Sequence, residues 1–91
     1  MYKIKTTNQF EKDFVKCSKR KFKLENLELV VETLETSGKL PLNYKPHLLS
    51  GNYKGYWECH IKSDWLLIWH QNENDKIIEL VRTGTHADLF K

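Results

Sequence analysis

The sequence predicts an α+β domain in which a helical hairpin covers one face of a mainly antiparallel four-stranded sheet. Apolar residues at helical spacing dominate positions 8–37, whereas short runs rich in β-branched and aromatic residues dominate positions 53–83. Three consecutive strands joined by short turns favour antiparallel pairing with the helices segregated to one side. We expect the order β-α-α-β-β-β and a short C-terminal helix. Residues 1–91 form one domain, because the chain is too short for two cores.

The first 38 residues are expected to form a strand and two helices. Residues 2–6 alternate between lysine and less polar side chains, which indicates a strand. Asn8 is a candidate N-cap for a helix over about 8–20, with Glu11 at the third position of a capping box. A second helix over about 23–37 carries leucines and valine on one face, and Gly38 is placed to end it.

The second half of the chain is expected to be mainly sheet. Residues 40–50 contain two prolines and are predicted to be an irregular connection. Strands are predicted over 53–61, 65–71 and 76–83, with a polar turn over 72–75. Thr85-His86-Ala87-Asp88 has the pattern of a capping box that opens a final helical turn.

Composition narrows the class of protein. No apolar run approaches the roughly 20 residues that span a bilayer, and the N-terminal residues lack the order of a signal peptide, so we expect a cytoplasmic protein without membrane contact. Cys17 and Cys59 are far apart and are expected to be reduced, structural thiols. A zinc site of Cys59 with His47, His60 and His86 lacks the usual ligand spacing, so no metal or other cofactor is expected.

Charge is unevenly distributed although the net charge is only +3. Residues 1–23 hold eight basic and two acidic residues, a balance of +6, and residues 24–38 have a balance of −4. A basic block of this kind can follow a phosphate backbone or attract an acidic protein partner. Taken alone, it is more often a solvated helix face.

Two histidine motifs suggest proton transfer, because histidine both takes and gives a proton near neutral pH. His60 and Asp64 flank a tight turn between two predicted strands, so a hairpin would bring the imidazole and the carboxylate close together. The alternative is an exposed histidine beside a turn-capping aspartate. His47, in the predicted loop, could position a substrate or share the role of base, whereas His70 is expected to have no role.

The C-terminal motif adds a third histidine, a cation and an aromatic ring. His86 follows the expected cap, so it lies where the helix dipole disfavours a charged ring and a phosphate would favour it. Arg82 could hold two phosphate oxygens, or form a surface salt bridge to Glu79 or Asp88. Phe90 could stack on a base or pin the tail to the core.

These motifs, over residues 47–51, 58–68 and 82–90, resemble those of the RelE superfamily of bacterial toxins and its YafQ branch. The resemblance runs nearly end to end and implies a ribosome-dependent messenger-RNA interferase of a type II toxin–antitoxin system. It implies attack of a ribose 2′-hydroxyl on the adjacent phosphate, without metal. The positions that match the family's functional residues are His47, His60, Asp64, His86 and Phe90, with Trp65 and Arg82 beside them.

The resemblance also suggests roles for these residues. We expect His86 to be the general acid for the leaving 5′-oxygen and His60, with Asp64, to be the general base. His47 would assist and Arg82 would steady the phosphate charge. Phe90 and Trp65 would orient the unstacked codon.

One position departs from the family pattern. Trp57 stands where relatives usually carry a basic residue before the acidic one, here Glu58. The phosphate or ribosomal-RNA contact at that position is missing unless Lys54 or Lys62 replaces it. Pro46, before His47, is also less usual and would stiffen that loop.

The resemblance implies partners as well. A cognate antitoxin would wrap an acidic segment around the basic surface and bind operator DNA through its other domain. The small ribosomal subunit and messenger RNA would be the other partners. Two further readings of the chain are a non-catalytic RelE-fold module that binds the ribosome or a partner, and a ribonuclease that acts on free RNA.

Overall fold

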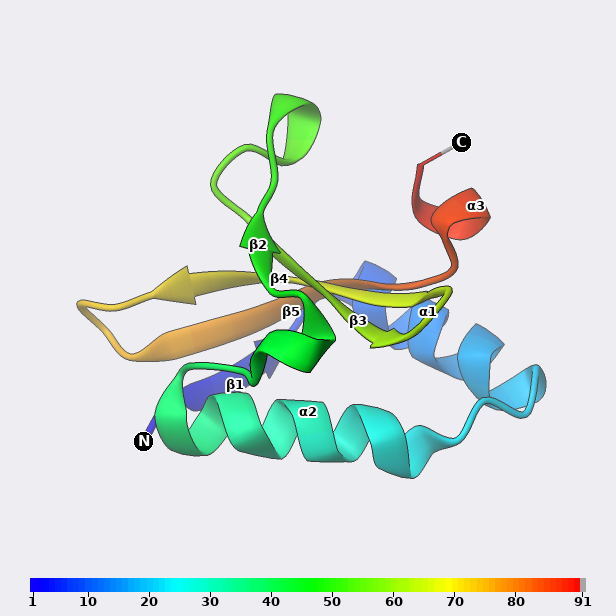
Figure 1. Cartoon of the computed structure of the whole chain (residues 1–91), viewed down its shortest axis with the longest axis horizontal. Helices are drawn as coiled ribbons and strands as arrows, with labels where there is room; N and C mark the ends of the chain where they lie inside the picture. The colour runs from blue at the N-terminus through cyan, green and yellow to red at the C-terminus, as the bar shows by residue number, and fades with distance from the viewer. Residues whose placement is uncertain (91) are drawn as a thin grey trace.

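The computed structural model describes residues 1–90 and has a five-stranded sheet with helices against both of its faces (Figure 1). In chain order the elements are β1 (Lys3–Thr6), α1 (Asn8–Lys19), α2 (Leu24–Ser37), the 3-10 turn η1 (Leu42–Tyr44), β2 (His47–Leu48), the 3-10 turn η2 (Gly51–Tyr53), β3 (Trp57–Lys62), β4 (Trp65–Asn72), β5 (Ile77–Gly84) and α3 (His86–Leu89).

The sheet order is β1-β5-β4-β3-β2, with β1 parallel to β5 and the other pairs antiparallel. The α+β class is confirmed, but the prediction of four strands is wrong. The additional strand, β2, is only two residues long and falls in the segment predicted to be irregular. Such a strand has no sequence period of its own, because it exists only through its pairing with β3.

Local signals place the helices correctly to within a few residues. The cap of α1 is Thr7 and not Asn8, since the Thr7 hydroxyl accepts a hydrogen bond from the backbone N–H of Phe10. Gly38 ends α2 as predicted, in a left-handed conformation with φ of 71° that suits glycine. The capping box of α3 is also confirmed, with both of its hydrogen bonds present.

Strand β4 is buried on both faces, and this divides the core into two clusters. Trp65, Leu67 and Trp69 face the large cluster beneath α1 and α2. Leu66 and Ile68 face the opposite side, where Leu89 of α3 packs on them. The hydrophobic contact of Leu89 therefore fixes the C-terminal helix on the face of the sheet that the helical hairpin leaves open.

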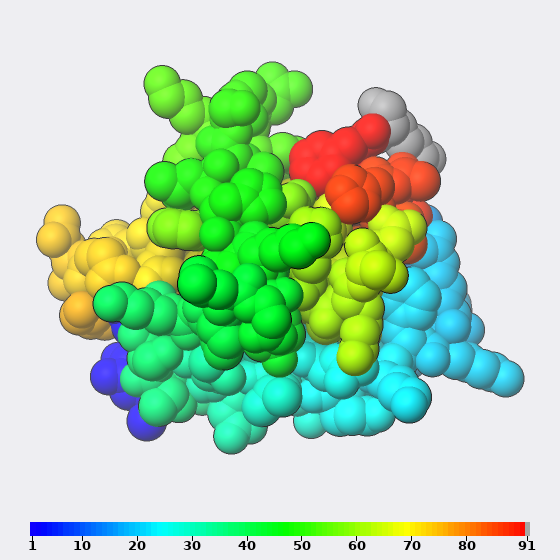
Figure 2. Space-filling model, viewed as in Figure 1, coloured from blue at the N-terminus to red at the C-terminus, as the bar shows by residue number. Residues whose placement is uncertain are grey.

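The space-filling view shows the same arrangement from outside (Figure 2). The C-terminal segment (red) lies beside the segment of β2 and η2 (green), on the side of the molecule away from α2 (cyan). None of the helices within residues 1–90 has the length and apolar character needed to cross a membrane.

Candidate active site

Three histidines form an arc on the face of the sheet opposite α2. His47 lies on β2, His60 on β3 and His86 at the start of α3. His60 is the register partner of Leu66, so its side chain shares the face on which α3 packs. The ring centroids of His47 and His60 are 6.5 Å apart, and those of His60 and His86 are 5.9 Å apart. The structure thus brings together the three histidines that match the family's functional positions.

Asp64 orients His86 and not His60. Its Oδ1 atom lies 2.9 Å from Nδ1 of His86 and accepts a hydrogen bond of 3.0 Å from the backbone N–H of His86. These two contacts hold the pKa of Asp64 below its usual value. The predicted pairing of His60 with Asp64 is wrong, because β5 delivers the N-terminus of α3 to the β3–β4 turn. An aspartate on Nδ1 fixes the ring so that Nε2 faces away from the carboxylate.

His47 is held at both ring nitrogens. Its Nδ1 donates to the carbonyl oxygen of Lys45 at 2.8 Å, and its Nε2 lies 3.1 Å from Oε1 of Glu58. Glu58 is only 5% exposed, and its other oxygen, Oε2, has no hydrogen-bond partner within residues 1–90. In contrast, the ring of His60 makes no hydrogen bond in the same part of the chain, so its nitrogens are available to a ligand.

Arg82 is bound to a buried carboxylate. Its Nε and Nη2 atoms donate to Asp13 of α1 at 2.7 and 3.2 Å, and this pairing raises the pKa of Arg82. The expected alternative, a surface bridge to Glu79 or Asp88, is wrong. Asp13 accepts from two of the five N–H groups of the guanidinium, so the contact of Arg82 with phosphate oxygens stays a prediction, to be made through the remaining N–H groups. Its positive charge remains on the side of the sheet shared by its register partner, Ile68.

Phe90 stands at the end of the arc. Its ring is 6.3 Å from that of His86 and makes an edge contact with Tyr53 at 5.9 Å. It is 44% exposed, whereas the neighbouring Leu89 is buried. Leu89 therefore anchors the tail to the core, and Phe90 is left with a ring face that a base could stack on.

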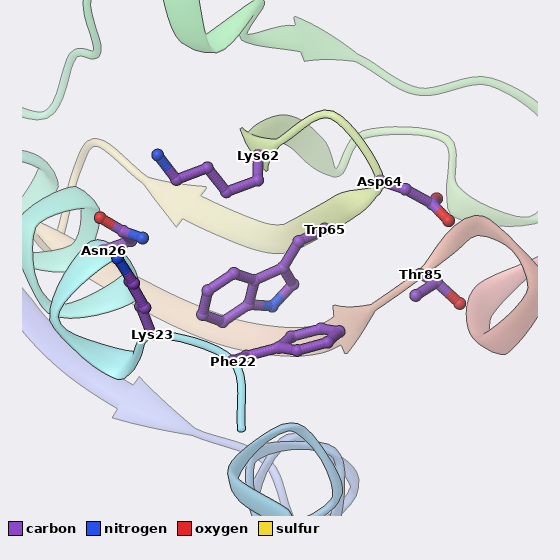
Figure 3. A pocket seen from close by; sticks show the side chains of 7 residues that line it. All are labelled: Phe22, Lys23, Asn26, Lys62, Asp64, Trp65 and Thr85. Atoms are coloured by element: carbon purple, nitrogen blue, oxygen red, sulfur yellow. The ribbon is translucent and has the colours of Figure 1, made fainter. Parts of the chain in front are cut away.

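Trp65 belongs to the core, and the predicted contact with an unstacked codon is contradicted. The residue is 4% exposed, its Nε1 donates to the hydroxyl of Thr83 at 2.9 Å, and its ring packs on Phe22. Figure 3 shows the two rings side by side beneath the β3–β4 turn, while Asp64 points away toward α3. Successive side chains of a strand point to opposite faces of the sheet. Leu66 faces the arc, so Trp65, which directly precedes it, faces the core beneath the helices.

Two lysines with a predicted RNA contact, Lys54 and Lys62, are exposed on the surface. Lys54 is exposed in the connection between η2 and β3. Lys62 is exposed at the end of β3 and, with Lys23 and Asn26, edges a hollow of about 490 Å³ over the rings of Phe22 and Trp65 (Figure 3). Neither lysine lies at the position of Trp57, where relatives usually carry a basic residue. The ring of Trp57 stacks on that of Trp69, with the ring centroids 6.1 Å apart.

Cys59 lies on the opposite face from the arc and is fully buried in the core beneath the helices. Burial raises the pKa of its thiol to about 12. Since Cys59 alternates with Glu58 and His60 along β3, it cannot join the histidines in a zinc site. Over residues 1–90, no group of three or more metal-ligating side chains has suitable geometry.

The sequence matches a known family over almost its whole length. The family described as "Bacterial toxin of type II toxin-antitoxin system, YafQ" matches residues 2–91. The chain belongs to this family. The mRNA interferase toxin YafQ of Escherichia coli (strain K12) is 40% identical over 89 residues, which are 96% of this chain and 94% of that protein. The putative toxin YafQ of Haemophilus influenzae is 32% identical over 81 residues, which are 86% of this chain and 79% of that protein.

Solved structures agree with this assignment. The toxin in the E. coli DinJ–YafQ complex superposes with a TM-score of 0.90, at 35% identity and over the whole of both chains. A metal-bound toxin from Helicobacter pylori superposes with a TM-score of 0.90, at 39% identity, over 99% of this chain and 100% of that one. The five-stranded fold of this chain therefore matches that of the solved YafQ structures.

Glu58 is the site residue of this YafQ-family chain for which the sequence predicted no role. It lies two residues before His60 on one strand, so the period of a strand places both on the same face. That signal was present in the sequence. Its contact with His47 was not, because it depends on the two-residue strand β2. His70, for which no role was predicted, lies outside the arc with its ring 5.5 Å from that of Tyr56.

Proposed function

We propose that this chain is a ribosome-dependent endoribonuclease, the toxin of a type II toxin–antitoxin system that cuts messenger RNA in the cytoplasm. Its family is that of type II toxins, and its E. coli relative is named an mRNA interferase. The observation that carries the proposal is the succession Asp64–His86–His60, in which one imidazole is oriented by a carboxylate and the next, 5.9 Å away, has no hydrogen bond to any of residues 1–90. The two rings differ in environment, as the acid and base of one reaction must.

His86 is the general acid of this proposal. Asp64 accepts from Nδ1 and stabilises the positive charge of the protonated ring, which leaves the Nε2 proton for the 5′-oxygen of the departing nucleoside. The second hydrogen bond, from the backbone of His86 to the same oxygen, prevents the carboxylate and the ring from rotating apart. Donation of that proton neutralises the leaving alkoxide as its bond to phosphorus breaks.

His60 is the general base. A free ring nitrogen takes the proton of the ribose 2′-hydroxyl as the oxygen attacks the adjacent phosphorus, and a 2′,3′-cyclic phosphate forms. The ring centroids of His60 and His86 are 5.9 Å apart, so a phosphate group bound between the two rings would have one imidazole beside its attacking oxygen and the other beside its leaving oxygen.

The surrounding residues supply charge and position. Arg82 contributes positive charge through space, because Asp13 holds its guanidinium. Phe90 offers an exposed ring next to His86, and stacking on a base contributes about 1–3 kcal/mol. Lys54 and Lys62 are the proposed contacts to RNA phosphates on either side of the arc.

The proposed partners are an antitoxin, the small ribosomal subunit and messenger RNA. The E. coli relative was solved in a complex with DinJ, and we extend that mode of partnership to this chain. The basic block is partly used within the molecule, since Lys16 of α1 and Arg20, the C-cap of that helix, pair with Asp88 of α3. The other basic residues of the block are proposed to attract an acidic antitoxin segment or ribosomal RNA, and the complex with antitoxin is proposed to bind operator DNA.

The test is a map of RNA ends after brief expression of the chain alone. We expect growth arrest and new 5′ ends in translated messages, in phase with the reading frame. His86→Gln should abolish the ends, while His70→Gln, a histidine on the sheet but outside the arc, should change nothing. A chelator should leave cleavage unchanged. Absence of cleavage ends would favour a binding module, and digestion of naked RNA would favour a ribosome-independent ribonuclease.

A further inference from the structure

Glu58 is a buried acid whose only polar partner within residues 1–90 is His47. We infer that Glu58 is a positioning residue that occupies Nε2 of His47 and thereby leaves His60 as the general base, an inference that rests on the proposed function. The observations are the 3.1 Å contact to Nε2, the 5% exposure of Glu58 and the unpartnered Oε2. Burying a carboxyl group costs folding free energy unless the group is hydrogen-bonded, so the one contact that Glu58 makes points to a function for this residue.

The contact leaves no free nitrogen on His47. A carbonyl oxygen only accepts, so the hydrogen bond to Lys45 requires a proton on Nδ1. A bare Nε2 and a carboxylate are both acceptors and would repel each other at 3.1 Å, so one proton must lie between them. Whether nitrogen or oxygen carries that proton, the lone pair of Nε2 is engaged.

The backbone is built to hold this arrangement. His47 is the register partner of Glu58, so the two side chains stand opposite each other on one face. Lys45 ends the turn η1 in a left-handed conformation, with φ of 50°. Pro46 follows it and leads into β2. The imidazole is therefore held from its own loop at Nδ1 and from the neighbouring strand at Nε2.

This arrangement divides the arc into two functions. His60 has free nitrogens and lies between the other two rings, so it is the group able to accept the 2′-hydroxyl proton. His47 and Glu58 together carry one shared proton and act on the phosphate by position and hydrogen bonding. Removing the acid should therefore convert His47 into a competent base.

A rescue experiment tests this with purified chain and ribosome-bound message. His60→Gln should lower the cleavage rate by roughly 10²–10⁴-fold, the usual contribution of a general base. Adding Glu58→Met, which keeps the volume but has no carboxylate, should raise the rate of that variant at least about tenfold. Adding Glu58→Gln should not, because the amide N–H still occupies Nε2. His47→Gln in the rescued variant should remove the gain.

Glu79→Gln is the matched control, since Glu79 is a sheet glutamate whose register partner is His70 and not a histidine of the arc. Equal rates for His60→Gln with and without Glu58→Met, in chains with native circular dichroism, would overturn the inference. A purely structural role for Glu58 could only lower the rate.

Nitrogen-15 NMR of the free chain separates this inference from the proposed function. The Nε2 resonance of His47 should move toward that of a bare nitrogen in Glu58→Met. An unchanged resonance would overturn the inference even if the enzyme cleaves RNA. If the resonance moves in Glu58→Met but the wild-type chain does not cleave RNA, the proposed function is refuted and the contact is established.

Discussion

Among the acidic residues, Asp13 is the one whose substitution is predicted to lower the free energy of unfolding most. It is 7% exposed, and four donors converge on its two oxygens: Nε and Nη2 of Arg82, the backbone N–H of Thr83 and the side-chain amide of Gln9. Asp13→Asn preserves the shape of the side chain but replaces one acceptor oxygen with a donor group. Each oxygen accepts from two of these donors, so whichever oxygen is replaced, two donors then face an amide N–H and lose their acceptor.

The expected loss of folding free energy is about 3 kcal/mol. Removing one member of a buried ion pair costs roughly 3–5 kcal/mol, and the lower end applies because the Arg82 side chain is 21% exposed. With an unfolding entropy of about 2.1 cal/mol/K per residue, this loss corresponds to a decrease in Tm of about 15 °C for a chain of this length.

Urea and thermal unfolding, followed by circular dichroism, measure this loss. Asp75→Asn is the matched control, since Asp75 is exposed in the β4–β5 turn and should change the unfolding free energy by less than about 0.5 kcal/mol. Arg82→Gln combined with Asp13→Asn should cost less than the sum of the two single changes. A loss below about 1 kcal/mol for Asp13→Asn would show that the convergence of donors does not stabilise the fold.

Three further predictions concern the supports of the site. Asp88→Asn should destabilise the chain at neutral pH and progressively less below about pH 4. The hydrogen bonds from Arg20 hold the pKa of Asp88 in the folded chain below its usual value. The contribution of Asp88 to stability is therefore present above the pKa of the unfolded chain and is lost as the pH falls through the pKa of the folded chain. Unfolding at several pH values measures this, and a difference independent of pH would contradict it. Trp65→Phe should lose the hydrogen bond to Thr83, reducing the unfolding free energy by about 1 kcal/mol while leaving RNA cleavage within about threefold; a large loss of cleavage in a folded protein would restore Trp65 to the RNA site. Thiol reagents should leave Cys59 unmodified in the native chain, because burial raises its pKa to about 12, and should modify it in urea; rapid native labelling would show that the sheet opens.

The amino-acid order by itself determined the helices, the three long strands and the capping box of α3. These follow from local causes: the spacing of apolar residues, the left-handed conformation that Gly38 can adopt at the end of α2, and the hydroxyl of Thr85 that caps α3. The family resemblance also singled out His47, His60 and His86, but the convergence of their rings depends on the fold. The same local logic failed for Asn8, since Thr7, one residue earlier, was equally able to cap α1.

Only the tertiary structure decided which side chains and strands that are distant in the sequence contact each other. Asp64 is 22 residues from His86, Asp13 is 69 residues from Arg82, and β2 forms only by pairing with β3. Such contacts depend on the order of strands in the sheet, which brings β1 and α1 beside β5 and the C-terminal helix beside the β3–β4 turn. A charge or a ring in a sequence has no partner until the fold supplies one, and the contacts of Asp64, Arg82, Trp65 and Glu58 arise only at that step.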